Sequence, residues 1–354
     1  MPHQASRIRN NAARQAAEPL QLQSPAAASR SHLLVQFSWL PVSVVAVLVF
    51  AFFALANPGF TAAINVASMV RTGAEIAITG FGMMAAIAMA SFDLSVGSVA
   101  GLAAIVAATA LESGHGLIAA IVAALIVGAV CGAINGVLVG YAKISAFVVT
   151  LGTFSVFLGV TLLYSGGNAV LITDKAMNYV GSASIGWLPL TGIAALIIAG
   201  LWFVLLDHTR LGRAILAIGG NPRATASVGI NVPLVQCAVF ILVGLSAAIS
   251  GFFEAATLLT VSPALGQDNF NLLTIAVVVI GGTSLRGGRA SIIGTLAGTA
   301  LIVVLEDGLQ VIGLSPLVNG LVVGLVLIVA LFASAMRDRY RARSLSGRRI
   351  ATLT

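Results

Sequence analysis

Charged residues are scarce in this chain of 354 residues. Asp, Glu, Lys and Arg make up 8% of the sequence, and hydrophobic residues make up 59%. Soluble domains carry about 25% charged residues. The mean hydropathy is +1.06, and no single water-soluble core could bury so much apolar sequence. The composition excludes a soluble enzyme and a disordered chain, and it leaves a polytopic α-helical membrane protein, for which lipid is the solvent.

The groups that carry catalysis and metal binding are also few. The two cysteines, Cys131 and Cys237, lie inside apolar runs, which favours buried thiols over a disulfide or a metal site. The four histidines are scattered, and the sequence contains neither a P-loop nor a nucleophile elbow with a usable triad. We therefore expect no catalytic residue, no metal site and no cofactor bound by this chain. Passage of a solute is favoured over chemistry.

Apolar runs near the 20 residues that a bilayer requires recur along the chain. The first is expected to be an uncleaved span, because its polar leader of 38 residues is too long for a signal peptide. Three shorter runs (94–111, 270–283 and 290–305) are expected to be short or broken helices. The predicted fold is all-α, with about ten transmembrane helices at 39–56, 73–91, 94–111, 117–140, 144–164, 187–206, 233–256, 270–283, 290–305 and 316–335.

The basic residues predict the orientation of these spans. If the N-terminus is cytoplasmic and ten spans alternate, all of the 18 Lys and Arg except Arg71 and Lys175 fall on the cytoplasmic side. Both termini are therefore expected in the cytoplasm. Residues 1–38 are expected to be a polar, disordered tail, 39–336 the transmembrane domain, and 337–354 a basic tail. Charges placed between spans and in tails indicate topology and not nucleic-acid binding.

The longest predicted cytoplasmic loop covers residues 207–232. Asn221 suits a helix N-cap, Pro222 the first helical position, and Gly229 the left-handed position after the last turn. We expect a bend at Gly219 and Gly220 that depends on the freedom of glycine. So short a helix is not stable alone, so it either docks on a partner or lies on the membrane as an amphipathic loop.

Residues 209–214 (TRLGRA) followed by 217–222 (AIGGNP) resemble the cytoplasmic coupling loop of the ribose/xylose/galactoside-type permease subunits of bacterial ABC importers. Three further stretches resemble that family in the same order: 92–98 (FDLSVGS), 146–153 (AFVVTLGT) and 276–285 (AVVVIGGTSL) with Gly287, Gly288 and Arg289. The resemblance spans about residues 40–335. It implies a multi-pass subunit of the bacterial inner membrane that translocates a monosaccharide or a similar small polyol.

The resemblance also implies partners. These are a separate cytoplasmic ABC ATPase that uses the ATP, a periplasmic sugar-binding protein, and a second permease copy or paralogue in the lipid bilayer. The binding protein is expected on the outer segments 165–187 and 257–270. The ATPase-coupling residues it implies are Thr209, Arg210, Gly212, Arg213, Gly219, Gly220, Asn221, Pro222, Arg223 and Gly229.

The sequence departs from the family pattern at three positions. Arg223 stands where the family usually has Glu, and Asn271 and Leu273 replace the two acids of a Glu-Leu-Asp pattern. These changes leave the identity of the solute open. Residues 80–101 and 275–298 are weakly similar to each other, each with a polar break between two apolar runs, which hints at a duplication.

Polar residues in or beside the spans are candidates for a solute pathway. A charge at bilayer depth is costly, so Asp93 is expected to face a cavity or a partner, and the turn from Asp93 to Ser95 could open a helix break in which Ser95 caps the next helix. The alternative is that Asp93 is an ordinary interfacial N-cap at the inner surface. For each uncharged residue, a hydrogen bond between helices is the alternative. The predicted pathway residues are Asp93, Ser95, Asn135, Thr150, Thr153, Asn168, Asn271 and Thr283.

Two other functions stay open at this point. An ion-coupled secondary transporter would need buried titratable carboxylates, for which Asp93 and Glu254 are the plausible members. ABC import of another small hydrophilic solute, such as a furanosyl signalling molecule, is the second.

Overall fold

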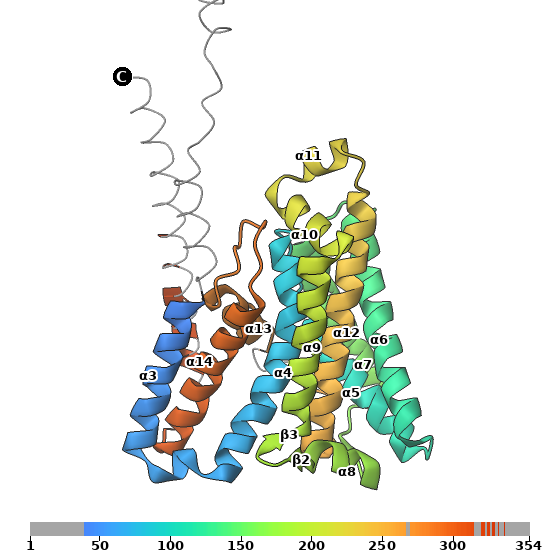
Figure 1. Ribbon diagram of the computed structural model, residues 1–354. Coiled ribbons are helices and arrows are strands. Elements are labelled where there is room, and N and C mark those ends of the chain that lie inside the picture. The colour runs from blue at the N-terminus through green and yellow to red at the C-terminus, as the bar shows by residue number, and fades with distance from the viewer. Residues whose placement is uncertain are drawn as a thin grey trace, which may run out of the picture. The chain divides into compact units, whose positions relative to one another are not determined.

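The computed structural model describes residues 39–266, 270–314 and scattered positions between 320 and 336. The predicted tails, 1–38 and 337–354, and most of the predicted span 316–335 lie outside the described residues. The part described is helical (Figure 1), as the sequence predicted, with four short strands that pair as two antiparallel two-stranded ladders. The helices are α3 (Leu40–Ala56), η1 (Pro58–Thr61), α4 (Ala63–Ala88), α5 (Val96–Glu112), α6 (Gly116–Gly140), α7 (Ala146–Ser165), α8 (Lys175–Ser182), α9 (Leu190–Phe203), η2 (Val204–His208), α10 (Arg210–Gly220), α11 (Pro222–Ser227), α12 (Val232–Leu258), α13 (Phe270–Ile280) and α14 (Ile292–Val311).

Five of the described helices are long and apolar enough to cross a membrane: α6, α7, α9 with its π-helical extension η2, α12 and α14. Three shorter apolar helices, α3, α5 and α13, match predicted spans as well. The structure is therefore that of a polytopic membrane protein. The prediction that 270–283 is a short helix is confirmed, because α13 has 11 residues and at 1.5 Å per residue covers about half of a 30 Å hydrocarbon core. The same prediction for 290–305 is wrong, because α14 continues to Val311 and has 20 residues.

Helix α4 is the centre of the bundle. It begins at Ala63, ten residues before the predicted start of its span, and its residues 74–88 are all buried. Helices α9, α12, α13 and α14 pack against it. Gly80 and Gly82 allow this, because a Cβ at Gly82 would lie 3.0 Å from the Val243 backbone and one at Gly80 would lie 3.1 Å from Thr295. Small residues thus let the helices pack closely, which matters because the hydrophobic effect does not drive helices together inside a bilayer.

After β4 (Thr260–Val261), a turn at residues 263–266 lies against α5. Strand β4 pairs antiparallel with β1 (Val170–Leu171). The chain then follows α5 so closely that a Cβ at Gly101 or Gly97 would overlap the carbonyl oxygens of Leu265 and Gly266. Helix α13 therefore begins beside the first turn of α5, and not at the end of the bundle where β4 lies.

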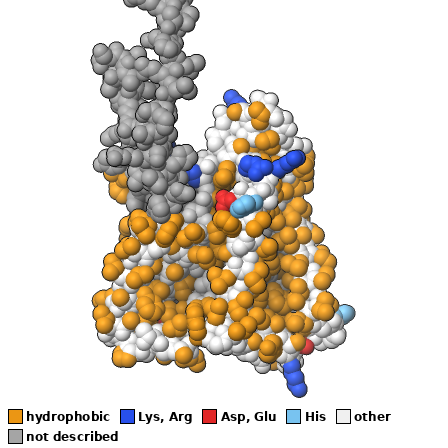
Figure 2. All heavy atoms as spheres, in the orientation of Figure 1, with side chains coloured by type: hydrophobic (Ala, Val, Ile, Leu, Met, Phe, Trp, Pro, Cys, Tyr) orange, Lys and Arg blue, Asp and Glu red, His pale blue; other side chains and the backbone are white. Residues whose placement is uncertain are grey.

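The two ends of the bundle carry different elements (Figure 1). Helices α10 and α11 cap one end, and α8 with the β2 (Ser184–Ile185) and β3 (Leu188–Pro189) ladder covers the other. Figure 2 shows Lys and Arg side chains gathered over α10 and α11, and hydrophobic side chains covering the flank between the two ends. We refer to these as the α10 end and the α8 end.

Candidate translocation and coupling site

The segment that links α9 to α12 folds as two short capped helices. The Gly212 N–H donates to Thr209 Oγ1 over 3.1 Å at the start of α10, and the Ala224 N–H donates to Asn221 Oδ1 over 3.0 Å at the start of α11. Pro222 opens α11, and Gly229 follows it with φ +84°. The predicted N-cap, first-turn proline and left-handed glycine are confirmed. We call residues 209–230 the coupling segment.

Helix α10 is amphipathic, and its two faces differ in what they contact. Ile215, Ile218 and Gly219 are buried against the bundle, while Arg210 and Arg213 are exposed. On α11, Arg223 is exposed. Cationic side chains at the outer face of short helices suit a partner with acidic groups.

The expectation that Gly220 needs the freedom of glycine is wrong. Neither Gly219 nor Gly220 has a positive φ, and a Cβ at Gly220 would meet nothing within 4 Å. Gly219 is the constrained position, because a Cβ there would overlap the Ala88 carbonyl oxygen and the Gly288 nitrogen. The constraint on this residue is close packing and not backbone conformation.

Four of the predicted pathway residues form one buried hydrogen-bonded cluster, which we call the polar network. Ser95 Oγ donates to Asp93 Oδ1 over 2.6 Å, Asn135 Nδ2 donates to Ser95 Oγ over 2.8 Å, and Thr153 Oγ1 donates to Asn135 Oδ1 over 2.8 Å. All four residues are less than 9% exposed. The network joins the loop before α5 to α6 and α7.

Ser95 has a different role from the predicted one. It occupies the N-cap position of α5, but its side chain caps no helical N–H. The side-chain bond in this region comes from Asp93 instead: the Ser95 N–H donates to Asp93 Oδ1 over 2.9 Å and closes a turn. Asp93 therefore closes a local turn ahead of α5, and because it is buried (2% exposed) it is not the interfacial N-cap that one alternative proposed.

The remaining predicted pathway residues divide into two groups. Two adjoin the polar network: Thr150 Oγ1 donates to the Phe92 carbonyl over 3.3 Å, and Asn271 Oδ1 accepts from the Gly97 N–H over 2.7 Å. The other two lie elsewhere. Asn168 is exposed and bonds the Gly166 carbonyl. Thr283 is buried in the loop after α13, and its hydroxyl has no hydrogen-bond partner among the described residues.

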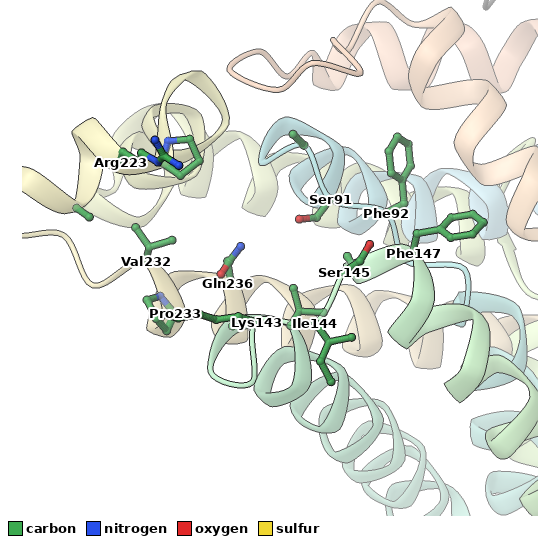
Figure 3. Close-up of a pocket in the computed structure, with 16 residues that line it drawn as sticks. Ser91, Phe92, Lys143, Ile144, Ser145, Phe147, Arg223, Val232, Pro233 and Gln236 are labelled. Atoms are coloured by element: carbon green, nitrogen blue, oxygen red, sulfur yellow. The ribbon is translucent and has the colours of Figure 1, made fainter.

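A groove of about 930 Å³ opens beside the polar network at the α10 end (Figure 3). Ser91 and Phe92 line it from the loop before α5, and Lys143 and Ser145 line it from the loop between α6 and α7. Arg223 of α11 and residues of the first turns of α12 complete it. Phe92 lines the groove, and its carbonyl accepts the hydrogen bond from Thr150, so groove and network share a wall.

Sequence reasoning missed the groove residues Ser91, Lys143 and Gln236. Lys143 carried a signal, because it stands alone between two apolar runs, and in the structure it adopts φ +57°. Ser91 and Gln236 carried none, since only the folded bundle brings the start of α12 opposite the loop before α5.

A helical bundle with an apolar flank, two chain breaks that meet beside α5, and a groove at one end defines a multi-pass membrane transport protein. The family model described as "Branched-chain amino acid transport system / permease component" matches residues 65–331. The chain belongs to this family, and it is a multi-pass membrane permease, a transport subunit of a bacterial ABC importer and not an enzyme.

Individual relatives are similar over most of their length. The chain is 37% identical over 276 residues to the ribose import permease protein RbsC of Bacillus subtilis, covering 77% of this chain and 85% of the relative. It is 35% identical over 296 residues to RbsC of Escherichia coli K12, covering 81% and 91%. It is 34% identical over 308 residues to the L-arabinose transport system permease protein AraH of the same strain, covering 85% and 90%. No solved structure matches the chain.

Proposed function

We propose that this permease imports a pentose or a similar monosaccharide. The observation that carries the proposal is the identity of 34–37% to relatives named for ribose and for L-arabinose, along at least 85% of their length. The family description names branched-chain amino acids instead. An amino acid carries two charges, whereas Asn135, Thr153 and Asn271 carry uncharged hydrogen-bonding groups, which bond one another, Ser95 and Gly97. We propose that they exchange these bonds for bonds to sugar hydroxyls when the pathway opens. The ABC family membership argues against an ion-coupled secondary transporter.

The proposed energy source is ATP hydrolysed on a separate cytoplasmic ATPase that contacts the coupling segment. The exposed Arg210, Arg213 and Arg223 side chains form the contact face. A partner shifts a conformational equilibrium only if it binds the two states differently. We therefore propose that ATP binding changes how the ATPase holds α10 and α11. This chain itself is proposed to bind no cofactor.

The α8 end is the proposed docking face for a periplasmic sugar-binding protein. The two outer segments expected from the sequence are joined there by the pairing of β1 with β4. Tyr179 on α8 and Trp187 beside the β2–β3 ladder are 69% and 72% exposed. Large exposed aromatic side chains are frequent anchors of protein interfaces.

The proposed topology has ten spans with both termini in the cytoplasm, and the transmembrane domain covers residues 39–336. The gathering of Lys and Arg over the α10 end supports a cytoplasmic location for that end (Figure 2). A second permease copy or paralogue completes the pathway. Six of the predicted residues are proposed to border the pathway once the groove opens further toward the middle of the membrane: Asp93, Ser95, Asn135, Thr150, Thr153 and Asn271. Asn168 is proposed to lie toward the entrance of the pathway, and Thr283 lies beside α13.

Substrate competition tests the proposed solute. The permease is reconstituted with its ATPase and its binding protein, and ATP-driven uptake of labelled ribose is measured. We expect excess unlabelled ribose, arabinose or xylose to reduce uptake at least tenfold and excess leucine to leave it within twofold. Uptake of leucine that no pentose reduces would contradict the proposal.

A further inference from the structure

Three separate chain segments meet at backbone level where α10 touches the bundle. The Gly288 N–H donates to the Ala88 carbonyl over 2.8 Å. Gly219 packs into this pair with no room for a Cβ, and a Cβ at Gly287 would lie 2.7 Å from the Gly219 carbonyl oxygen. Gly287 and Gly288 both have positive φ, +79° and +77°. We call Ala88, Gly219, Gly287 and Gly288 the glycine junction.

The glycine junction places the coupling segment against both of the chain breaks that the sequence marked as weakly similar. Ala88 is the last residue of α4, and the loop from it reaches Asp93 within five residues. Gly287 and Gly288 lie in the loop after α13. No flexible side chain lies between α10 and either loop at these contacts. A displacement of α10 therefore moves the backbone of both loops, because no side chain at these contacts can absorb it by changing its rotamer.

Both loops lead back to the first turn of α5. Along the first, Asp93 bonds the Ser95 N–H and hydroxyl, and Ser95 is bonded in turn by Asn135. Along the second, Gly281 packs on Gly294 so closely that α13 and α14 are held together. At its other end α13 presents Asn271 to the Gly97 N–H. Ser95 and Gly97 are two residues apart, so two routes from Gly219 converge on one helix start.

We propose that the glycine junction is the transmission element of the transporter: it makes α10, the loop before α5 and the loop after α13 move as one unit, and so delivers motion of the coupling segment to the polar network. Gly219, Gly287 and Gly288 are positioning residues for transport. This inference rests on the proposed ATP-driven function. It adds the path by which the conformational change caused by ATP reaches the membrane interior. Spatial intermediacy alone does not establish coupling, so the test must separate coupling from folding.

The test compares Gly219→Ala with Gly200→Ala in the reconstituted complex. The control glycine lies on α9 with nothing within 4 Å of its Cβ position, so both variants add one methyl group to a helical glycine. A thiol probe at Ala90→Cys, in a background of Cys131→Ala and Cys237→Ala, reports on the loop before α5, since Ala90 is exposed and lines the groove. Assembly yield, ATP hydrolysis, uptake and the probe's response to ATP are measured for each.

We expect Gly219→Ala to assemble and hydrolyse ATP within twofold of the parent while uptake falls at least tenfold and the ATP response of the probe is lost. Gly200→Ala should match the parent in every measurement. Unchanged uptake and an unchanged probe response in Gly219→Ala would overturn the inference. If the parent itself shows no ATP-driven uptake, the proposed function fails instead, and the two failures are thus distinguishable.

Hydrogen exchange in the unsubstituted complex decides the question if Gly219→Ala does not assemble. The Gly288 N–H donates to the Ala88 carbonyl over 2.8 Å, so exchange of this amide reports whether the loop after α13 stays joined to the end of α4. If the junction moves as one unit, its protection should be the same within twofold with and without ATP. A tenfold loss of protection when ATP binds would show that these segments separate during transport, and it would overturn the inference.

Discussion

Asn135 uses both ends of its side-chain amide, and this makes it the link between three elements. It donates to Ser95 and accepts from Thr153, and it is fully buried. A buried amide with both groups satisfied holds its neighbours in one arrangement, and one that loses a partner costs about 1–3 kcal/mol. The packing of α5, α6 and α7 at this depth therefore depends on a few hydrogen bonds.

Thr153→Val should be destabilising because it removes the donor to Asn135 while keeping the shape of the side chain. We expect a loss of about 1–3 kcal/mol in the free energy of unfolding, measured by thermal unfolding in detergent. Thr161→Val is the matched control on the same helix. The Thr161 hydroxyl bonds only the Phe157 carbonyl within α7, so its removal should cost under about 0.5 kcal/mol. Equal costs for the two variants would mean that the network contributes nothing to stability.

At the scale of elements, the short helices at the α10 end differ in how they are held. Helix α10 packs against α4 and η2 through a buried face. Helix α11 has six residues, of which only Thr225 is buried. An isolated helix of this length is not stable in water. The cap at Asn221, together with the proposed contact with the ATPase, is expected to supply what packing does not.

Asn221→Ala should impair coupling more than stability. Loss of the cap costs about 1 kcal/mol locally, which is enough to disorder a six-residue helix that contributes little to the core. We expect ATP hydrolysis stimulated by loaded binding protein to fall severalfold with an unchanged melting temperature. Asn231→Ala removes the equivalent cap from α12, where Asn231 Oδ1 accepts from the Leu234 N–H, but that helix has 27 residues, of which 12 are buried. The control should lower the melting temperature slightly and keep stimulation, and the reverse pattern would contradict this account.

Most elements could be predicted from the sequence, because hydropathy and capping residues act locally. The spans at α6, α7 and α12, the cap at Asn221 and the first helical position at Pro222 are of this kind. The early start of α4 was missed because Asn65 and Arg71 lower the hydropathy of its first turns, and Asn65 is satisfied at a distance by Asp307. The glycine junction and the groove could not be predicted, since they join residues that only the fold brings together.

At the scale of the whole molecule, the account requires the α10 end and the α8 end to face opposite sides of the membrane. Lys175 and Arg223 are exposed at these ends and suit single-cysteine labelling in the background of Cys131→Ala and Cys237→Ala. A membrane-impermeant maleimide should label Lys175→Cys in intact spheroplasts. It should label Arg223→Cys only after permeabilisation. Labelling of both in intact cells would invalidate the proposed topology.

The most direct test of the central claim is solute uptake into proteoliposomes that contain the permease and its ATPase. Binding protein loaded with labelled ribose is supplied at the face that carries the α8 end, and ATP at the face that carries the α10 end. We predict uptake that requires both, and that stops when the P-loop lysine of the ATPase is replaced. Uptake driven by a proton or sodium gradient in vesicles that contain the permease without the ATPase would contradict the account.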